Sequence, residues 1–547
     1  MRILVAQLNP TIGDFEGNTR KIIQALDHAR SKQVDIVLFS ELVLCGYPPE
    51  DLLLHPSFIE AGQKYLEKIL PSTAGLMAIV GMVRRNPAKG EKPIFNSAAI
   101  IHDTKLLGFA DKQLLPTYDV FDERRYFEPG STTQIWELKG KRIGVMVCED
   151  IWQHAGLVDD TNYARDPVLD LKPLKPDLVL NLSSSPYHFQ KPGTRVKVCV
   201  KCAETLQCPV ILCCQVGAND QLVFDGYSLY VGSKGELLQV AKGFEEDEMV
   251  VDLDAPAVAR SFSYDPIHDL YRALVLGVRD YFYKQGFKKG CLGLSGGIDS
   301  ALVACIAVEA LGKENVLAIT MPSRYSSAGS VSDSEVLARN LSVELLHIPI
   351  EKPFEVFLDL LNPYFKGKPS DVTEENMQAR IRGMILMALS NKHGYIVMST
   401  GNKSEMGLGY CTLYGDMCGG LGVISDVTKQ QVYALARWLN REKEIIPQSI
   451  IDKAPSAELR PDQKDTDSLP EYSVVDKVLQ GYVEEYLSPE EIAKKYEVPI
   501  ETVLNLICRI HYAEYKRRQA PPGIRVTKKA FNAGRRYPIV QRWMCHS

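Results

Sequence analysis

The chain has 547 residues, 45% of them hydrophobic and 24% charged, and a formal net charge of −5. Its length exceeds one ordinary core, so we expect a soluble globular protein of two or three domains. The charge balance excludes a general attraction to nucleic acid or to an anionic membrane, and no apolar run approaches the length of a membrane span. Thirteen cysteines without a disulfide framework predict a reducing, cytoplasmic location.

Short apolar runs alternate with amphipathic stretches from residue 1 to about 255. The helical spacing of GNTRKIIQALDHARSK predicts a helix, and VFDGYSLYVGSKGELLQVAKG predicts a hairpin. Strands are predicted at RILVAQL, VDIVLFS, LMAIVGMV, SAAIIHD, RIGVMVC, DLVLNLS and PVILCCQV. This alternation predicts α/β layers.

Polar side chains of this half stand at or near the ends of apolar runs. Glu41 follows VDIVLFS, Cys148 ends RIGVMVC, and Lys112 lies in the loop-like stretch FADKQLLP. Strand ends are where open α/β layers present catalytic groups. We expect Glu41 to take the thiol proton of Cys148, whose sulfur then attacks a carbon–nitrogen bond. We expect Lys112 to stabilise the charge that develops on oxygen and to favour the thiolate.

The pattern restarts after SYDPIHDL, which predicts a domain boundary near residues 255–265. Beyond it the chain predicts a helix over 269–286, a strand at CLGLS and a helix from about Asp299. Strands again alternate with helices, so we expect a second α/β domain.

The stretch LGLSGGIDSAL joins that strand to that helix. The glycine pair lets the backbone approach an anion, and the helix N-terminus with Ser295 and Ser300 supplies donors. A Walker loop would carry a lysine that reaches the transferred phosphoryl group, and this loop has none. We therefore expect it to hold a pyrophosphate that leaves as one unit, so that ATP is cut between its α and β phosphates. The alternative is a plain Gly-Gly turn between a strand and a helix.

This loop matches the SGGxDS signature and resembles the pyrophosphatase-loop ATP enzymes, which activate a carboxylate or carbonyl group as an adenylate. That family includes NAD, GMP and asparagine synthetases and tRNA-modifying enzymes, and the loop alone does not choose among them. The resemblance implies ATP-binding residues at Leu294, Ser295, Gly296, Gly297, Ile298, Asp299, Ser300 and Ala301.

A second stretch, VMSTGNKSEMGLGYCTLYGDMCGG, resembles the second signature of the NAD synthetases. The resemblance implies that Thr400 contacts ATP and that Glu405 joins Asp299 as a Mg²⁺ ligand. Cys418 departs from the pattern, because a small or polar residue is expected there. The dinucleotide substrate, deamido-NAD, is then expected to contact Asn376, Arg380, Glu405 and Lys516.

The NAD synthetase resemblance covers essentially residues 265 to 540. It extends to Lys429 in SDVTK, to KRRQAPPG, and to PSAELRPDQKDTDSLPEY, which corresponds to a mobile flap.

The residues Glu41, Lys112 and Cys148, in their contexts, resemble the nitrilase superfamily over about residues 1 to 255. The type it resembles is the glutaminase found fused to NAD synthetase. This implies that glutamine is held by Tyr118, Ser185 and Lys191, with Glu123 as a second, supporting carboxylate.

Together these resemblances imply a glutaminase domain over 1–258 and a synthetase domain over 259–547. The expected fold is a nitrilase-like α-β-β-α sandwich followed by a Rossmann-like, doubly wound parallel sheet. The expected reaction amidates deamido-NAD to NAD with glutamine as nitrogen donor and ATP as co-substrate, assisted by Mg²⁺. Ammonia is expected to pass internally between the two sites, and the synthetase domain to form a dimer, or an octamer in the fused form.

Other interpretations stay open on single features. ENMQARIRG alone fits an ordinary amphipathic helix, and the basic stretch from Lys516 would suit an RNA-binding protein if aromatic residues were less sparse. Cys199 and Cys202 form a CxxC, but no second pair completes a zinc set and the segment reads as a core helix. A GMP or asparagine synthetase would carry another glutaminase fold. A non-catalytic binding module would not need the three catalytic candidates together.

Overall fold

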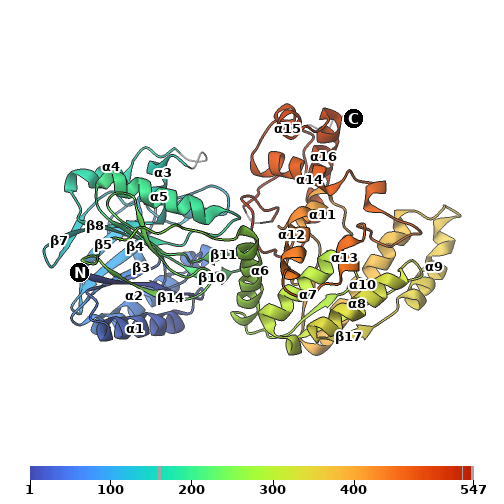
Figure 1. The fold of residues 1–547 in the computed structure, drawn as a ribbon, viewed down its shortest axis with the longest axis horizontal. Helices are drawn as coiled ribbons and strands as arrows, with labels where there is room; N and C mark the ends of the chain where they lie inside the picture. The colour runs from blue at the N-terminus through green and yellow to red at the C-terminus, as the bar shows by residue number, and fades with distance from the viewer. Residues whose placement is uncertain (158–161, 533, 544–547) are drawn as a thin grey trace. The chain divides into compact units, whose positions relative to one another are not determined.

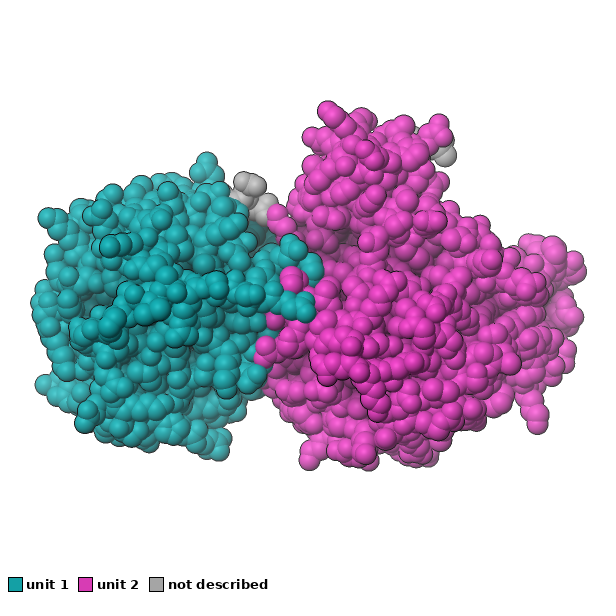
Figure 2. All heavy atoms as spheres, viewed as in Figure 1, with its two compact units in different colours: residues 1–265 teal, residues 266–547 magenta. Residues whose placement is uncertain are grey.

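The computed structural model describes residues 1–157, 162–532 and 534–543. The chain divides into two compact units, Met1–Asp265 and Pro266–Ser547, coloured separately in Figure 2. Among the described residues, no helix has both the length and the apolar character needed to cross a membrane.

The first unit contains two six-stranded sheets. One runs in the order β14 (Asp247–Asp252), β1 (Arg2–Gln7), β2 (Ile36–Phe39), β3 (Met77–Arg85), β4 (Ile94–His102) and β5 (Lys105–Asp111). The other runs in the order β13 (Leu237–Val240), β12 (Leu229–Val231), β9 (Val210–Cys214), β8 (Leu178–Ser183), β7 (Lys141–Val147) and β6 (Ile135–Leu138). The central strands of each sheet are parallel and their outer neighbours antiparallel. A separate antiparallel pair is formed by β10 (Val216–Asn219) and β11 (Leu222–Asp225).

The side chains of the central strands explain how these sheets stack. Along β1, Ile3 and Val5 face one apolar cluster, shared with the second sheet, while Leu4 and Ala6 face another, shared with helices. A strand buried on both faces needs such a continuous apolar run, because each face meets a separate layer. The two sheets therefore lie face to face with a core between them.

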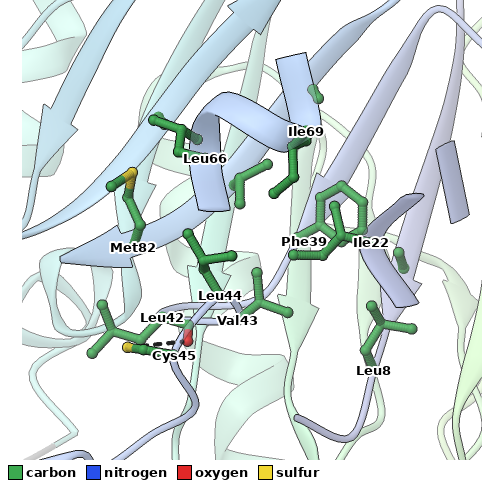
Figure 3. Packing of buried hydrophobic residues seen from close by; sticks show 14 of the residues in the cluster. Leu8, Ile22, Phe39, Leu42, Val43, Leu44, Cys45, Leu66, Ile69 and Met82 are labelled. Atoms are coloured by element: carbon green, nitrogen blue, oxygen red, sulfur yellow. Dashed lines mark hydrogen bonds between the residues drawn. The ribbon is translucent and has the colours of Figure 1, made fainter. Parts of the chain in front are cut away.

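Helices cover both outer faces of this sandwich (Figure 1). The helices on the first sheet are α1 (Phe15–Ser31) and α2 (Pro56–Ile69); those on the second are α3 (Trp152–Ala155), α4 (Pro167–Leu171) and α5 (Lys191–Leu206). Figure 3 shows Ile22 of α1 with Leu66 and Ile69 of α2 in the cluster that contains Phe39 and Met82. The α-β-β-α sandwich predicted from the sequence is confirmed.

The second unit is built on a five-stranded parallel sheet. Its order is β17 (Glu344–His347), β16 (Val316–Thr320), β15 (Gly290–Gly293), β18 (Ile396–Ser399) and β19 (Leu421–Gly422). The chain moves outward on one side of β15 and then returns to its other side. The predicted doubly wound parallel sheet is thus confirmed, with its reversal of strand order between β15 and β18. Ligands bind at such a reversal, outside the carboxyl ends of the strands.

Helices lie on both faces of this sheet, and a helical cluster follows it. The helices are α6 (Pro266–Tyr283), α7 (Ile298–Leu311), α8 (Ala328–Leu341), α9 (Glu351–Phe365), α10 (Val372–His393), α11 (Lys403–Leu408), α12 (Lys429–Leu439), α13 (Gln448–Asp452), α14 (Tyr472–Leu479), α15 (Pro489–Tyr496), α16 (Ile500–Tyr512) and α17 (Glu514–Arg517). α6, α7 and α12 pack together, α9 and α10 share the core of β15 and β16, and α14 to α16 enclose their own apolar cluster.

Candidate active sites

The three catalytic candidates of the first unit come from the ends of three strands. Glu41 lies just beyond β2, Lys112 follows the last residue of β5, and Cys148 follows the last residue of β7. The Lys112 Nζ donates to Glu41 Oε1 at 2.7 Å and to Glu123 Oε1 at 2.8 Å. These side chains are almost completely buried: the exposed fraction is 1% for Lys112, 0% for Glu41 and 5% for Glu123.

Glu41 is held in place by further donors. Asn96 Nδ2 donates to its Oε1 at 2.7 Å, and the backbone N–H of Ser184 donates to its Oε2 at 2.9 Å. On the other carboxylate, the Tyr47 hydroxyl donates to Glu123 Oε1 at 2.8 Å. Burial raises the pKa of Glu123 to about 7, although Lys112 opposes that rise. The ammonium of Lys112 thus lies between two fixed carboxyl groups.

Cys148 sits in a sharp turn at the end of β7. Its φ angle is +43°, in the left-handed region that side chains rarely adopt. The Asp150 carboxylate braces the turn by accepting from Val147 N at 3.0 Å and from Gln113 N and Leu114 N, each at 2.9 Å. One carboxylate therefore joins the turn of the nucleophile to the residues directly after Lys112.

The surroundings of Cys148 disfavour the thiolate form of its side chain. Burial is the largest cause that raises the pKa of Cys148 well above its ordinary value, and the charge of Glu41 raises it further. Lys112 and the Ser183 hydroxyl, which lies 3.4 Å from Sγ, lower it only in part. Lys112 acts in the expected direction, because it lowers the pKa of the thiol, but burial and the Glu41 carboxylate outweigh it. A base must take the proton during the reaction.

A further carboxylate, that of Glu149, lies directly beside the nucleophile in the chain and is 4% exposed. It accepts from the Tyr118 hydroxyl at 3.1 Å and from the Tyr163 hydroxyl at 3.3 Å. Burial raises the pKa of Glu149, and Lys112, both tyrosines and Lys191 counteract the rise. A buried anion supported by neutral hydroxyl groups is a suitable partner for a cationic group.

The other predicted glutamine contacts lie in the same unit. Ser185 is buried just after β8, and Lys191 begins α5 with its Nζ donating to Pro186 O at 2.6 Å. The Lys191 ammonium also lies 5.4 Å from the ring centre of Trp152, which follows the turn of the nucleophile.

In the second unit, a cavity of about 440 Å³ opens at the carboxyl ends of β15 and β18, at the reversal of strand order. The predicted residues that line it are Leu294, Ser295, Gly297, Ile298, Asp299, Ser300, Asn376, Thr400, Glu405, Lys429 and Lys516. This volume lies within the range of small-molecule sites.

The glycine loop forms the floor of an anion site. Gly296 has a φ of +76°, and a Cβ there would lie 2.3 Å from the carbonyl oxygen of Ser330, so only glycine fits. The hydroxyl of Ser300 accepts from Ser295 N at 3.2 Å and donates to Gly297 O at 3.0 Å, which fixes the loop. Gly297 caps α7 without a side chain, so the first N–H groups of the helix are directed at whatever lies before it.

Two carboxylates from the first turns of different helices, Asp299 of α7 and Glu405 of α11, lie beside this loop. Lys429 Nζ lies 2.5 Å from Asp299 Oδ2 and 3.3 Å from Glu405 Oε1. Asn402 Nδ2 donates to Asp299 Oδ1 at 2.9 Å, and its Oδ1 accepts from Glu405 N at 3.0 Å. Burial raises the pKa of Glu405 to about 8; Lys429 opposes the rise and the charge of Asp299 adds to it.

These two carboxylates fit a divalent cation. Hard oxygen donors that face each other at a phosphate-binding loop are the ligands Mg²⁺ prefers, with water and phosphate oxygens completing its shell. The repulsion between Asp299 and Glu405 indicates a place for positive charge, part of which Lys429 supplies.

The segment predicted as a flap borders the cavity. Pro455, Ser456, Glu458 and Asp465 are among its lining residues. Glu458 accepts from Lys453 Nζ at 2.5 Å, while its carboxylate also accepts from hydroxyl groups at the start of α8, those of Ser327 at 3.0 Å and Ser330 at 2.9 Å.

Comparison with known proteins identifies the family to which each unit is similar. The family model of carbon-nitrogen hydrolases matches residues 2–261, and that of NAD synthases matches residues 270–520. The glutamine-dependent NAD(+) synthetase of Synechocystis is 46% identical, with 98% of each chain covered, and that of Thermotoga maritima is 43% identical, with 99% of each covered. The chain belongs to the glutamine-dependent NAD(+) synthetase family.

Solved structures of this family have the same fold over the whole chain. The glutamine-dependent NAD(+) synthetase of Acinetobacter baumannii, determined with adenosine diphosphate, is 39% identical with a TM-score of 0.78, covering 100% of this chain and 99% of its own. The glutamine-dependent NAD(+) synthetase of Cytophaga hutchinsonii is 21% identical with a TM-score of 0.85, covering 99% and 98%, and supports the fold alone.

Three residues predicted from the synthetase signatures do not line the cavity. Gly296 shapes the loop from behind, Ala301 is buried in α7, and Arg380 is exposed with its Nε donating to Leu413 O at 3.2 Å. Arg382, two residues further along α10, lines the cavity instead and donates from Nε to Met321 O at 3.0 Å. Burial lowers the pKa of Arg382 to about 10, so its guanidinium stays charged near neutral pH.

The CxxC of the first unit lies in a core. Cys199 and Cys202 are completely buried on the inner face of α5, and burial raises the pKa of both thiols. Within the described residues no group of three or more histidine, cysteine or acidic side chains gathers around a metal position.

Proposed function

We propose that this chain amidates deamido-NAD to NAD with nitrogen from glutamine, converting ATP to AMP and pyrophosphate and releasing glutamate. The observation that carries the proposal is the pairing, in one chain of this family, of two different sites. One holds a buried cysteine with a lysine between two carboxylates, and the other a lysine-free phosphate loop beside two carboxylates.

The first reaction releases ammonia from glutamine. Glu41 takes the proton of the Cys148 thiol, and the sulfur attacks the carboxamide carbon while Lys112 stabilises the oxyanion. Ammonia leaves with a proton returned from Glu41, and a thioester remains. Glu41 then takes a proton from water, the water oxygen attacks the thioester, and glutamate and the thiol are regenerated.

The charged end of glutamine sets its orientation. We place its α-ammonium against Glu149, because that carboxylate is buried beside the nucleophile and accepts its side-chain hydrogen bonds from neutral hydroxyl groups. Tyr118, Ser185 and Lys191 complete the proposed glutamine site, with the Lys191 ammonium suited to the α-carboxylate.

The second reaction joins ammonia to the nicotinate carboxylate. That carboxylate attacks the α-phosphorus of ATP, pyrophosphate leaves, and ammonia attacks the carbonyl carbon of the adenylate to expel AMP. Thr400 and the loop residues that line the cavity hold ATP, and Asn376, Glu405 and Lys516 hold deamido-NAD. Asp299 and Glu405 would hold Mg²⁺, which supplies positive charge to the departing pyrophosphate. The ammonium of Lys429, which lies beside both carboxylates, adds a further positive charge at this place.

Each half of the chain carries one of the two reactions. We assign the glutaminase to residues 1–258 and the synthetase to 259–547, which the compact units Met1–Asp265 and Pro266–Ser547 support. Ammonia is delivered internally, because free ammonia near neutral pH is mostly the non-nucleophilic ammonium ion. All described cysteines are free, which supports a reducing, cytoplasmic setting.

We also propose that the synthetase unit forms a homodimer. Val356, Leu360 and Tyr364 form one stripe along α9, with 65%, 61% and 76% of their surface exposed. Their spacing of four residues places them on the same face of the helix. An exposed apolar stripe of this kind marks an interaction surface, and a second copy is the partner that the family resemblance implies.

Product analysis tests the reaction. The full chain is incubated with deamido-NAD, ATP, Mg²⁺ and glutamine labelled with ¹⁵N in the amide, in the presence of unlabelled ammonium. We expect NAD that carries ¹⁵N, with one AMP, one pyrophosphate and one glutamate for each NAD. ADP with phosphate would overturn the adenylation step. NAD without the label would overturn internal delivery.

A further inference from the structure

Tyr163 lies in the glutaminase unit but matches no signature of the sequence. It lies in the chain between α3 and α4. Its hydroxyl donates to Glu149 Oε1 at 3.3 Å. Tyr118 donates to the same oxygen at 3.1 Å, so two tyrosines from separate segments converge on one carboxylate. The negative charges of Glu149 and Glu123 both raise the pKa of the Tyr163 hydroxyl, which burial raises most.

A pair of backbone hydrogen bonds fixes the position of Tyr163. The side-chain amide of Gln153 accepts from Tyr163 N at 2.7 Å and donates to Tyr163 O at 2.8 Å. Gln153 belongs to α3, which continues directly from the turn formed by Cys148–Ile151. The clamp therefore ties Tyr163 to the same rigid piece of chain that carries both the nucleophile and Glu149.

A second contact closes the same segment. His154 Nδ1 lies 2.7 Å from Asp166 Oδ2, and its Nε2 lies 2.8 Å from the Thr205 hydroxyl on α5. Asp166 in turn caps α4 by accepting from Val168 N at 3.0 Å. The backbone of Tyr163 is thus held by Gln153, and the chain three residues further on is held by the contact of Asp166 with His154.

We propose that Tyr163 is a positioning residue for substrate specificity, which holds Glu149 charged and oriented toward the α-ammonium of glutamine. The inference rests on the proposed function and extends it to the question of which amides are accepted. A neutral hydroxyl stabilises the buried carboxylate and leaves its negative charge in place, whereas the ammonium of a lysine would cancel that charge. The site then favours amides that carry a cation at the other end of the molecule.

The test compares two substrates that differ only in that cation. Glutaramic acid has the carboxamide and the carboxylate of glutamine but no α-amino group. For Tyr163→Phe, we expect kcat/KM for glutamine hydrolysis to fall by about tenfold through KM, because a hydrogen bond to a charged group is lost. The kcat/KM for glutaramic acid should change by less than about twofold, since that substrate presents no cation to Glu149.

Gln153→Ala provides a second variant that keeps the hydroxyl but removes its clamp. We expect a smaller loss in the same direction, again confined to glutamine. Tyr126→Phe is the matched control, because it also removes a tyrosine–carboxylate bond, that of Tyr126 to Asp51 at 2.7 Å, on an exposed surface. This control should hydrolyse both substrates as the wild type does.

The outcomes distinguish a failure of the role given to Tyr163 from a failure of the proposed glutaminase function. Equal losses on glutamine and glutaramic acid, or no loss in Tyr163→Phe, would overturn the role of Tyr163 while leaving a working glutaminase. A wild-type protein that releases no glutamate from glutamine would instead overturn the proposed function. NAD synthesis from added ammonia, measured in every variant, should be unchanged, because the synthetase site lies in the other unit.

Discussion

The protonation of Cys148 determines where its reaction begins. Burial and the nearby Glu41 raise the pKa of the thiol well above 9, its ordinary value. Below the pKa the thiolate fraction increases about tenfold for each pH unit, so the resting protein holds almost no thiolate near neutral pH. The nucleophile therefore appears only when Glu41 accepts the proton beside a bound substrate.

Alkylation of Cys148 measures this directly. In the absence of glutamine, the rate of reaction with iodoacetamide should rise by about tenfold per pH unit up to pH 9, without a plateau. Glu41→Gln removes the carboxylate that raises the pKa, so this variant should be alkylated faster at pH 8 although it hydrolyses no glutamine. Peptide mass spectrometry gives the rate at this residue. A wild-type plateau below pH 8 would contradict the argument.

Asp299 provides a residue-scale test of the synthetase. Asp299→Asn should lower NAD synthesis by at least about 100-fold with either glutamine or ammonia, because one charged oxygen ligand for Mg²⁺ at the pyrophosphate is lost. Glutamate release by the first unit should persist. Initial rates of NAD formation with each nitrogen source check this, and full ammonia-dependent synthesis in the variant would rule out the metal role.

Among single residues, the sequence predicted those that belong to motifs and missed those that reach the site only through the fold. Glu41, Lys112 and Glu123 come together within hydrogen-bond distance as their motifs implied, although their roles stay predictions. Tyr163 had no signal, because its contact with Glu149 depends on the path of a loop. Glu149 itself had one usable signal, since it is a charged residue directly after a predicted nucleophile.

Among the elements, the stripe on α9 is the feature with the clearest consequence. Leu360→Asp places a charge in the centre of the apolar stripe formed with Val356 and Tyr364. A charge buried in an apolar interface without a partner costs several kcal/mol, so we expect the dimer to dissociate at micromolar concentration. Sedimentation velocity measures the mass.

The control for α9 is Asn362→Asp, which introduces the same charge at an exposed position of the helix that lies on the side away from the stripe. It should sediment as the wild type does. A Leu360→Asp protein with unchanged mass would show that α9 does not form the interface.

Element prediction succeeded where both faces of a strand are buried. The apolar runs at β1, β2, β3, β8 and β9 were visible because nearly continuous burial selects apolar residues at almost every position. The strands β5 and β6 were not predicted, because they lie at sheet edges and their sequences are partly polar. The strand at CLGLS ends at Gly293, earlier than predicted, because the chain turns into the phosphate loop there.

For the whole molecule, the two sites should separate in a single variant. Cys148→Ala cannot form a thioester, so NAD synthesis from glutamine should be lost. The phosphate loop, Thr400 and Glu405 are unaffected, and excess ammonia should therefore restore NAD synthesis to near the wild-type ammonia rate. NAD formation with each nitrogen source checks both halves of this expectation.

Two results would contradict the split. A Cys148→Ala protein that still makes NAD from glutamine at the wild-type rate would remove this cysteine from the mechanism. Loss of both activities in a folded protein would show that one site controls the other, rather than only supplying it with ammonia.

The left-handed backbone of Cys148 also links activity to stability. A residue with a side chain at a φ of +43° costs the fold about 1–2 kcal/mol, and glycine avoids most of this cost. The protein carries this strained cysteine because glycine, which would relieve the strain, has no thiol to act as the nucleophile. Cys148→Gly should therefore unfold at a temperature at least as high as Cys148→Ala, whereas glycine at an ordinary strand position is less stable than alanine by about 0.5–1 kcal/mol. Selection for stability alone would remove the nucleophile.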